Sequence, residues 1–329
     1  MGESLRTAFV TGAAGLVGGA VAESLVRDGY RVVCLGHSER VLDHRPTLKA
    51  AVWVRGSVAD LPLMRDVIAR YEPEEVYHYA ASALVRGAVR DPAGAVLTNT
   101  FGTAAVLEAC RIVGGVKAAL IAGTDKEYGN VLRATEDTPL RPEHVYDASK
   151  ASSDLIAQAY ARDYSLPIVI TRACNIFGPG DMHWSRIVPR TCRELATGGR
   201  PVIFEQALRM RREFLYVNDY VAAARWLVSG LRDKVFFGAD RFTVSPGAIF
   251  NVGSGHVYTV ADVVKLITAA SGRNVEPEVQ PRDGAFDELL EQSLDCTKLR
   301  NLGWRPASDI VEALTDTYRW YQGFLTGEA

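Results

Sequence analysis

The stretch that decides the fold is TAFVTGAAGLVGGAVAESLV, residues 7–26. It opens with a short apolar run (7–11), passes through a glycine-rich turn and continues as a helix-like segment (16–26). A short run that is apolar throughout is typical of a strand buried on both faces, and the spacing after the turn is that of a helix. The stretch therefore predicts a strand, a tight turn and a helix at the start of a parallel sheet.

The turn itself has the spacing GxxGxxG, with glycines at Gly12, Gly15 and Gly18. Glycine tolerates the backbone angles of such a turn, and its missing side chain lets a pyrophosphate approach the N-terminus of the following helix. The position between the first strand and the first helix predicts a dinucleotide-binding loop, to which Leu16 and Val17 also belong.

Further apolar runs continue the pattern outward from this loop, with a helix-like segment between each and the next. They are RVVCLG (31–36), AVWVRG (51–56), EVYHYA (75–80), KAALIAG (117–123) and PIVITRA (167–173). Alternating strands and helices predict an α/β, Rossmann-type doubly wound parallel sheet. We expect an NAD(P)-binding Rossmann domain over residues 1–173, rejoined by parts of 212–253.

After Arg172 the rhythm changes to longer loops and short strands, and Gly178-Pro179-Gly180 breaks the chain. Residues 174–329 are expected to form a smaller C-terminal α/β substrate-binding domain. Its helices are predicted at about 187–197, 219–230, 260–271 and 310–323. Open α/β sheets bind ligands at the carboxyl ends of their strands, so this domain should cover that edge.

The composition favours an ordinary globular enzyme. Hydrophobic residues make up 48% of the 329 residues and the net charge is −2, which leaves no electrostatic signature of nucleic acid or an anionic membrane as a partner. We find no signal peptide and no apolar run long enough to span a bilayer, and we expect a cytoplasmic location. The five cysteines are scattered and no histidine stands at ligand spacing, so free buried thiols and no metal site are expected.

The candidate catalytic pair is Tyr146 and Lys150, four residues apart in HVYDASKAS at the start of a predicted helix that runs to about Tyr164. This spacing places both side chains on one face of the helix. An ammonium group close to the phenol favours phenolate, so we expect the pKa of Tyr146 to fall from about 10 toward the working pH. Tyr146 could then take a proton from a sugar hydroxyl as a hydride leaves.

Together these motifs resemble the extended short-chain dehydrogenase/reductases that act on nucleotide sugars, over nearly the whole chain. The resemblance includes TNTFGT, TDKEYG (124–129), NIFGPGD (175–181), RREFLYVNDY (211–220) and LDCTKLRNLGWRP (294–306). SALVR, TDK, YDASK and GPGDMHWSRIVP look like the subgroup of CDP-glucose 4,6-dehydratases. The resemblance implies a tightly bound NAD or NADP, a nucleotide-diphosphate sugar as substrate, and a homodimer formed through two helices of each subunit.

The expected cofactor residues lie at the carboxyl ends of the predicted strands and on the catalytic helix. They are Gly12, Gly15, Leu16, Val17, Gly18, His37, Ser38, Arg40, Ser57, Val58, Ala80, Ala81, Ser82, Asn99, Tyr146 and Lys150. The segment Gly36–Arg40 does not decide whether the cofactor is NAD or NADP. A site that prefers NAD usually has an acidic residue at the end of the second strand for the ribose 2′-hydroxyl, and here the stretch is Gly36-His37-Ser38-Glu39-Arg40. Ser38 and Arg40 could instead hold the 2′-phosphate of NADP, or all of these could be solvated loop residues. His78, in the fourth strand, is expected to be a core residue with satisfied hydrogen bonds.

Three residues after the fifth strand point to the reaction. Thr124 suits a hydrogen bond to the C4 oxygen, and Asp125 suits the acid that protonates a departing C6 hydroxyl, as the family resemblance implies for a 4,6-dehydratase. Lys126 stands where many sugar dehydratases have glutamate as the C5 base. Glu127 is a second candidate for that base, although strand-like alternation would point it away from Lys126.

The substrate side is predicted from the resemblance and from the chemistry of arginine, whose guanidinium suits a diphosphate. The expected residues are Arg86, Thr124, Asn175, Arg186, Ile187, Arg212 and Arg282. A nucleotide-sugar 4,6-dehydratase that acts on a CDP-glucose-like substrate is the predicted function. The alternatives are a nucleotide-sugar 4-epimerase with the same cofactor and a non-catalytic dinucleotide-binding protein.

Overall fold

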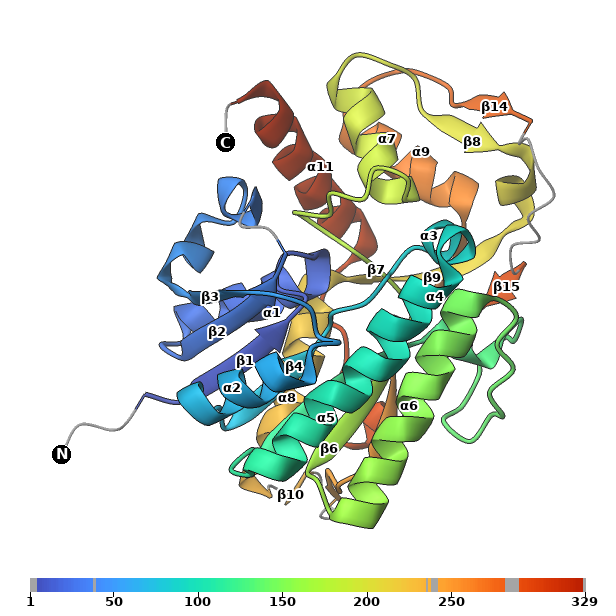
Figure 1. Ribbon diagram of the computed structural model, residues 1–329. Helices are drawn as coiled ribbons and strands as arrows, with labels where there is room; N and C mark the ends of the chain where they lie inside the picture. The colour runs from blue at the N-terminus through green and yellow to red at the C-terminus, as the bar shows by residue number, and fades with distance from the viewer. Residues whose placement is uncertain (1–4, 38–39, 235, 238–241, 282–289, 328–329) are drawn as a thin grey trace.

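A seven-stranded parallel sheet forms the centre of the protein, in the order β12-β6-β5-β4-β1-β2-β3 (Figure 1). The computed structural model describes residues 5–37, 40–234, 236–237, 242–281 and 290–327. The strands are β1 (Thr7–Thr11), β2 (Arg31–Gly36), β3 (Val52–Arg55), β4 (Glu75–His78), β5 (Ala118–Thr124), β6 (Ile168–Ala173) and β12 (Ala248–Val252). The predicted Rossmann-type α/β fold is confirmed, and each predicted strand of the sheet ends within two residues of its predicted bounds.

Helices cover both faces of the sheet because its strands are apolar on both sides. On one face α1 (Leu16–Arg27) and α8 (Val217–Asp233) pack side by side against the strands. On the other face lie α2 (Leu61–Tyr71), α5 (Gly102–Val113) and α6 (Val145–Tyr164). Helix α6 begins one residue before Tyr146 and ends at the predicted residue, so the catalytic pair lies in its first two turns.

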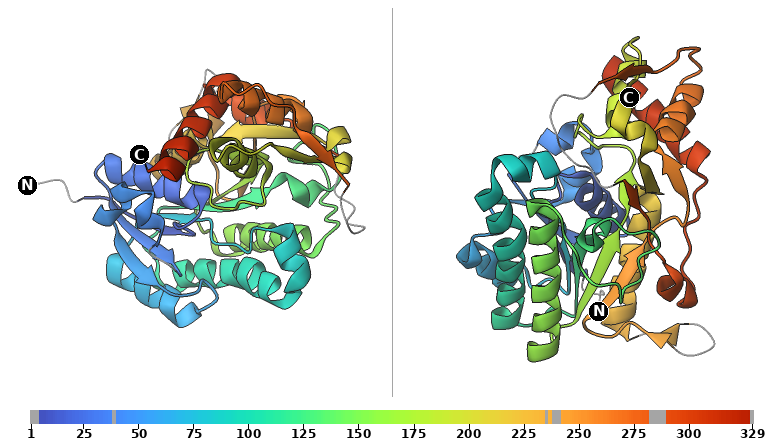
Figure 2. Two further views of the ribbon diagram at one scale, coloured as in Figure 1. Left: turned by 90° about the horizontal axis from the view of Figure 1, so that it is seen from above. Right: turned by 90° about the vertical axis from the view of Figure 1, so that its right-hand side faces the viewer.

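The smaller second layer lies across the carboxyl edge of the sheet, as both views in Figure 2 show. Its strands are β7 (Asn175–Phe177), β9 (Arg211–Tyr216), β13 (Val257–Thr259) and β15 (Glu291–Gln292), with β8 (Val202–Phe204) paired to β14 (Glu278–Gln280). Its helices α7 (Ile187–Ala196), α9 (Val260–Ala270) and α11 (Ile310–Thr326) bury a separate apolar cluster. The chain returns to the sheet through α8 and β12 between these segments.

The remaining described elements are short. They are η1 (Arg40–Asp43), η2 (Pro46–Ala50), α3 (Val85–Arg90), α4 (Pro92–Val96), the π-helical turn η3 (Leu97–Phe101), η4 (Asp125–Tyr128), η5 (Glu205–Arg209), β10 (Phe236–Phe237), β11 (Phe242–Thr243) and α10 (Thr297–Asn301).

The strand order places the switch point of the sheet between β1 and β4. From β1 the chain builds outward through β2 and β3 in one direction, and β4, β5, β6 and β12 extend in the other. Ligands of open α/β sheets bind in the crevice at the carboxyl ends of the strands at such a point. The glycine turn after β1 and the segment after β4 flank this crevice.

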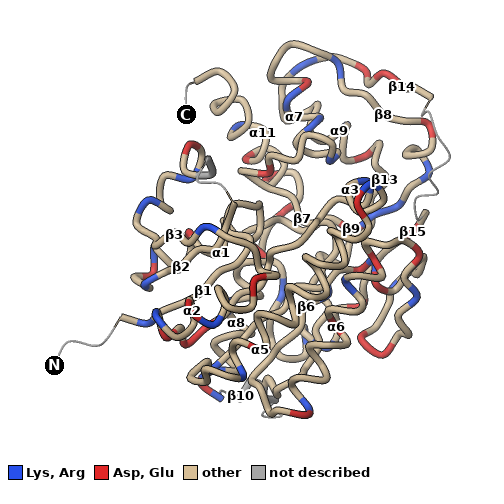
Figure 3. Tube along the Cα trace, in the orientation of Figure 1, with Lys and Arg blue, Asp and Glu red and all other residues tan. Residues whose placement is uncertain are grey.

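Basic and acidic residues are interspersed over the described part of the chain (Figure 3), in agreement with a net charge of −2. All five cysteines are free and buried, as predicted. Among the described residues no helix is long and apolar enough to cross a membrane.

Candidate active site

The glycine turn is shaped by close packing against the segment that follows β4. Gly12 has a φ of +69°, and a Cβ there would lie 2.7 Å from the backbone nitrogen of Ala80. Only glycine therefore fits at this position. Helix α1 begins after Gly15 with no side chain capping its first N–H groups, which leaves its N-terminus suited to a phosphate. Leu16, Val17 and Gly18 form the first turn of α1, so the predicted loop fits the diphosphate of a dinucleotide.

A chain of buried hydrogen bonds ties this turn to the segment after β4. The Thr11 hydroxyl accepts hydrogen bonds from the backbone nitrogens of Tyr79 and Ala80, at 3.2 and 3.1 Å, and donates its own hydrogen to Nδ1 of His78 at 2.8 Å. Nε2 of His78 donates to the Thr103 hydroxyl at 3.0 Å. This pattern assigns one neutral tautomer to His78, and burial lowers its pKa to about 3. The predicted core role of His78 is confirmed.

Asn99 carries the same network to the catalytic helix. The Thr103 hydroxyl donates to its backbone carbonyl, its Oδ1 accepts from the nitrogen of Ser82 at 2.7 Å, and its Nδ2 donates to the Ser149 hydroxyl at 2.8 Å. Asn99 is 1% exposed. Its side chain therefore positions the segment with Ala80, Ala81 and Ser82, while those half-buried residues border the crevice.

The predicted catalytic pair, Tyr146 and Lys150, lies at the buried start of α6. Lys150 donates a hydrogen bond to the carbonyl of Ala122 in β5, and burial lowers its pKa. Burial raises the pKa of Tyr146, and the charge of Arg186 offsets this increase only in part. The expected fall in the pKa of Tyr146 is therefore wrong for the protein as it stands, because the cost of burying a phenolate exceeds the effect of the positive charge near it.

The three residues predicted to decide the reaction lie together at the end of β5. Asp125 is 3% exposed; its Oδ1 accepts the Thr124 hydroxyl at 3.1 Å and lies 3.6 Å from Nζ of Lys126. Its Oδ2 is buried and has no hydrogen-bond partner among the described residues. The Nζ of Lys126 also donates to Oε1 of Gln292 at 3.3 Å. The cluster thus combines a buried carboxyl, a hydroxyl and a partly exposed amine.

Glu127 does not lie on a strand, which corrects the alternation expected there. Residues Asp125–Tyr128 form a turn of 3-10 helix in which Thr124 is the N-cap, and the carboxylate of Glu127 turns back to accept the nitrogen of Thr124 at 2.9 Å. This reciprocal pairing is a capping box, whereas the sequence analysis expected an extended strand here. The side chain of Glu127 is completely buried, whereas that of Lys126 is 23% exposed.

The substrate-side residues come from several elements of the second layer. Asn175 begins β7 and donates to the carbonyl of Glu213 at 3.1 Å. Arg186 caps α7 and binds Asp181 at 3.0 Å, and Ile187 is the first residue of that helix. Arg212 in β9 is 9% exposed and donates to two backbone carbonyls. Of this set, Arg186 acts on Tyr146, because its charge opposes part of the increase in pKa that burial causes.

The other predicted residues are less informative. Arg86 is exposed on α3, and His37 is exposed directly after β2. Ser57 and Val58 follow β3, with Val58 buried in the core. Arg40 begins η1, and its side chain lies outside the described residues, as do Ser38 and Arg282.

Two residues that sequence reasoning missed are Gln292 and Arg45. Gln292 stands opposite Arg212 in the β15–β9 pairing, and it lies 166 positions from its partner Lys126. Arg45 is 5% exposed and joins three segments: it pairs with Glu23 and donates to the carbonyls of Leu16 and Pro179. No local sequence pattern predicts either contact, because the partners of both residues are distant in the sequence.

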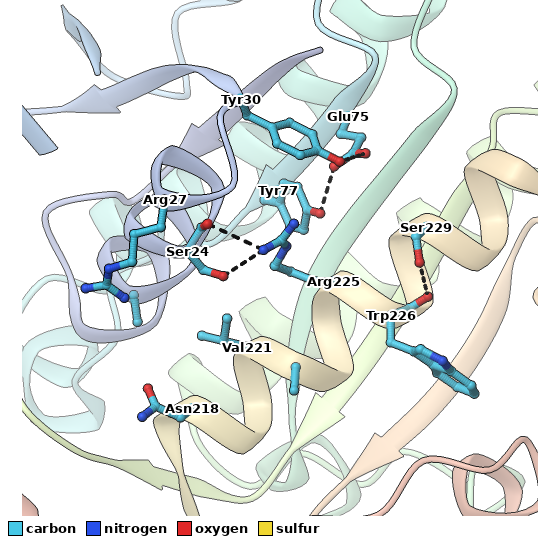
Figure 4. Close-up of a pocket in the computed structure, with 12 residues that line it drawn as sticks. Ser24, Arg27, Tyr30, Glu75, Tyr77, Asn218, Val221, Arg225, Trp226 and Ser229 are labelled. Carbon is cyan, nitrogen blue, oxygen red and sulfur yellow. Dashed lines mark hydrogen bonds between the residues drawn. The ribbon is translucent and has the colours of Figure 1, made fainter. Parts of the chain in front are cut away.

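A groove between α1 and α8 contains none of the predicted residues (Figure 4). Arg225 crosses it to bind the Ser24 hydroxyl at 2.8 Å, and the Tyr77 hydroxyl donates to Glu75 at 2.9 Å. Arg225, Ser24, Tyr77 and Glu75 are thus taken up by contacts within the groove, and we assign the chemistry to the carboxyl edge of the sheet.

Comparison with known proteins identifies the family of the chain. The model of the NAD dependent epimerase/dehydratase family matches residues 8–253. The chain belongs to this family. Family membership confirms the predicted recognition and the prediction of an NAD-dependent enzyme of this kind.

Two relatives in this family show how far the similarity extends. The dTDP-glucose 4,6-dehydratase of Streptomyces antibioticus is 32% identical over 330 residues, with 95% of this chain and 92% of the relative covered. The protein of the same name from Streptomyces griseus is 31% identical, with 95% and 93% covered. These relatives do not establish which nucleobase the substrate of this chain carries, so the nucleobase stays a prediction.

Solved structures of the family include both reaction types. The UDP-glucose 4-epimerase of Thermotoga maritima has a TM-score of 0.85 and 27% identity, with 97% of this chain and 100% of that chain covered. A dTDP-glucose 4,6-dehydratase from Streptomyces venezuelae, determined with NAD, has a TM-score of 0.83 and 27% identity, with 96% and 97% covered. The fold is thus shared by epimerases and dehydratases, and only the side chains of the site can distinguish them.

Proposed function

We propose that the protein is a nucleotide-sugar 4,6-dehydratase that converts a nucleoside-diphosphate glucose into its 4-keto-6-deoxy derivative. The observation that carries the proposal is the buried Asp125 carboxyl beside Thr124 and Lys126. A C4 epimerase needs only a hydroxyl and the Tyr–Lys pair, because nothing leaves C6. Elimination of water needs in addition an acid for the departing C6 hydroxyl and a base for the C5 proton, and Asp125 with Lys126 can supply both.

The first half-reaction uses the residues at the start of α6. Tyr146 takes the proton of the C4 hydroxyl, and the Thr124 hydroxyl orients the C4 oxygen. Arg186 supplies positive charge that favours the phenolate. The ammonium of Lys150, one turn along α6, is assigned the same part. Bound NAD supplies a hydride acceptor for C4 and a hydride donor for C6.

The elimination is divided between Asp125 and Lys126. Oxidation at C4 acidifies the C5 proton, which Lys126 removes while Asp125 protonates the departing C6 hydroxyl. The free Oδ2 of Asp125 can carry that proton, since Thr124 and Lys126 lie on the side of Oδ1. Lys126 is held beside Asp125 by its hydrogen bond to Gln292, which orients the amine. Lys126 suits the base better than Glu127, whose carboxylate is completely buried.

The remaining parts of the proposal concern binding. We assign NAD rather than NADP as the tightly bound cofactor, because the family is described as NAD dependent and the neighbour from Streptomyces venezuelae was determined with NAD. Arg212, with Arg282 and Asn175, is assigned to the substrate diphosphate, and Arg86 to the sugar. A location in the cytoplasm belongs to the same proposal.

A homodimer is proposed through the outer face of α5 and α6, which lie side by side (Figure 1). Large apolar side chains are exposed on these helices and on the turn before α5, and contiguous exposed apolar surface is typical of an interface. They are Leu97, Phe101, Ile112, Val113, Leu155 and Tyr164.

Incubation of the holoenzyme with CDP-, UDP-, GDP- and dTDP-glucose tests the reaction and the nucleobase together. A 4-keto-6-deoxy sugar is recognised by its ultraviolet absorbance in alkali. We expect it from one nucleotide, and the sequence resemblance predicts CDP-glucose, whereas the relatives are named for dTDP- and UDP-glucose. Formation of a C4 epimer without the keto sugar would establish an epimerase, and no reaction with any nucleotide glucose would refute the proposal.

A further inference from the structure

Glu127 is a completely buried acid to which the proposed mechanism gives no part. Its Oε1 accepts the nitrogen of Thr124 at 2.9 Å. Its Oε2 has no hydrogen-bond partner among the described residues, and the nearest ion-pair contact is Nε of Arg172 at 3.6 Å. A buried carboxylate with one oxygen unbonded costs stability, so its retention needs a reason.

Space for this carboxylate is built into the neighbouring strand. A Cβ on Gly123 would lie 2.8 Å from Oε1 of Glu127 and 2.9 Å from the carbonyl of Thr171. Any larger residue at this point of β5 would push the carboxylate out of its place. The position of Glu127 is therefore specified by the strand as well as by its own turn.

Three buried charged groups, Arg172, Asp154 and Glu127, lie in contact here. Lys150 is held next to them on the carbonyl of Ala122, the residue before Gly123. Arg172 binds both oxygens of Asp154, at 2.8 and 3.2 Å, and also donates to the Tyr128 hydroxyl. With Asp154 taken up by Arg172, the remaining acid Glu127 balances the remaining cation Lys150. Burial and the charge of Asp154 raise the pKa of Glu127, while Lys150 and Arg172 lower it. The carboxylates of Glu127 and Asp154 in turn raise the pKa of Lys150 against burial.

We propose that Glu127 is a positioning residue for the first half-reaction, which holds Lys150 in its cationic form from the buried side of the site. The inference rests on the proposed use of Tyr146 and Lys150. It gives Glu127 a role through Lys150 rather than contact with the substrate.

The charge of Glu127 acts on both members of the catalytic pair in the same direction. It favours the ammonium of Lys150, and together with Asp147 and Asp125 it disfavours the phenolate of Tyr146. Removal of this charge should let Lys150 lose its proton at lower pH and let Tyr146 ionise at lower pH. Both limbs of the pH profile of hydride transfer should then move to lower pH together, by about one unit, as is typical of a neighbouring charge.

The test is the rate of cofactor reduction in a single turnover, measured against pH for the parent holoenzyme and for Glu127→Gln. The amide keeps the bond to Thr124 and removes only the charge. We expect both limbs to shift down by about one unit, while the KM for the nucleotide sugar stays within twofold of that of the parent. A loss of rate by the same factor at every pH would show a structural role only and would overturn the proposal.

Two further variants complete the design. Glu127→Asp withdraws the carboxylate by one methylene and should shift both limbs of the pH profile in the same direction by less. This variant tests the proposal if Glu127→Gln does not fold. Glu75→Gln is the matched control, because Glu75 is also a buried acid, bonded to Tyr77 at the opposite end of β4. Both limbs of the pH profile of Glu75→Gln should coincide with those of the parent.

Two other outcomes separate this inference from the proposed function. Cofactor reduction is common to dehydratases and epimerases, so the shift can be measured whether or not a 4-keto-6-deoxy sugar accumulates. If Glu127→Gln keeps the parent profile of cofactor reduction but loses solvent-deuterium exchange at C5, Glu127 is the C5 base and the positioning role is refuted.

Discussion

Replacement of His78 by glutamine should make the protein less sensitive to acid. In the folded state His78 is neutral, because Nδ1 accepts from Thr11 and Nε2 donates to Thr103, and burial lowers its pKa to about 3. A second proton on the ring would face a hydroxyl that already accepts two backbone N–H groups. In the unfolded chain the same ring has its ordinary pKa of 6.5.

The pKa difference fixes the size and sign of the effect. Above pH 6.5 the ring is neutral in both states and contributes no pH dependence. Below it, the unfolded state takes up a proton that the folded state refuses, so stability falls by about 1.4 kcal/mol for each pH unit until the folded pKa is reached. Between about pH 7 and about pH 5 His78 should therefore cost the parent ~2 kcal/mol, a large part of a typical folding free energy.

The assay is urea-induced unfolding of the parent and of His78→Gln at both pH values. The variant should be less stable near neutral pH by about 1–3 kcal/mol, the cost of an impaired buried hydrogen bond, but should lose ~2 kcal/mol less than the parent on acidification. His256→Gln, at an exposed histidine, controls for the removal of a histidine as such. Equal losses of stability in the parent and in His78→Gln would refute the assignment of a buried neutral ring.

Three further predictions concern other parts of the site. Gly12→Ala should weaken NAD binding at least about tenfold in a titration, because its Cβ would strike Ala80. The control is Gly29→Ala, at a φ of +78° with nothing within 4 Å of the added Cβ, which should lower stability and leave NAD binding unchanged. Arg45→Met should lower the free energy of unfolding by about 3 kcal/mol in urea, since it leaves the buried Glu23 only the exposed Arg27 at 3.8 Å as a partner. Arg45→Met combined with Glu23→Leu should recover much of the loss. Lys126→Met should abolish solvent-deuterium exchange at C5 and leave cofactor reduction intact; exchange that persists would exclude Lys126 as the base.

The sequence predicted the local parts of the site well, for a physical reason. Strands that are buried on both faces must be apolar throughout, so their positions are visible in composition alone. The helix with Tyr146 and Lys150 begins where its spacing requires, and the glycine turn has one geometry that suits its residues. The turn at Asp125–Tyr128 was misread, because a capping box can replace an extended strand end without a change in hydrophobic pattern.

What the sequence by itself determined is the sheet, the glycine turn after its first strand and the helix that carries Tyr146 and Lys150, because these depend on residues close together in the chain. Only the tertiary structure decided which charges meet. Lys126 is paired with Gln292 from 166 positions away, and Glu127 lies beside Arg172 in the interior. The protonation states of Tyr146 and Lys150 depend on such burial and long-range contacts, since the energy of a charge is set by its whole surroundings rather than by its neighbours in sequence.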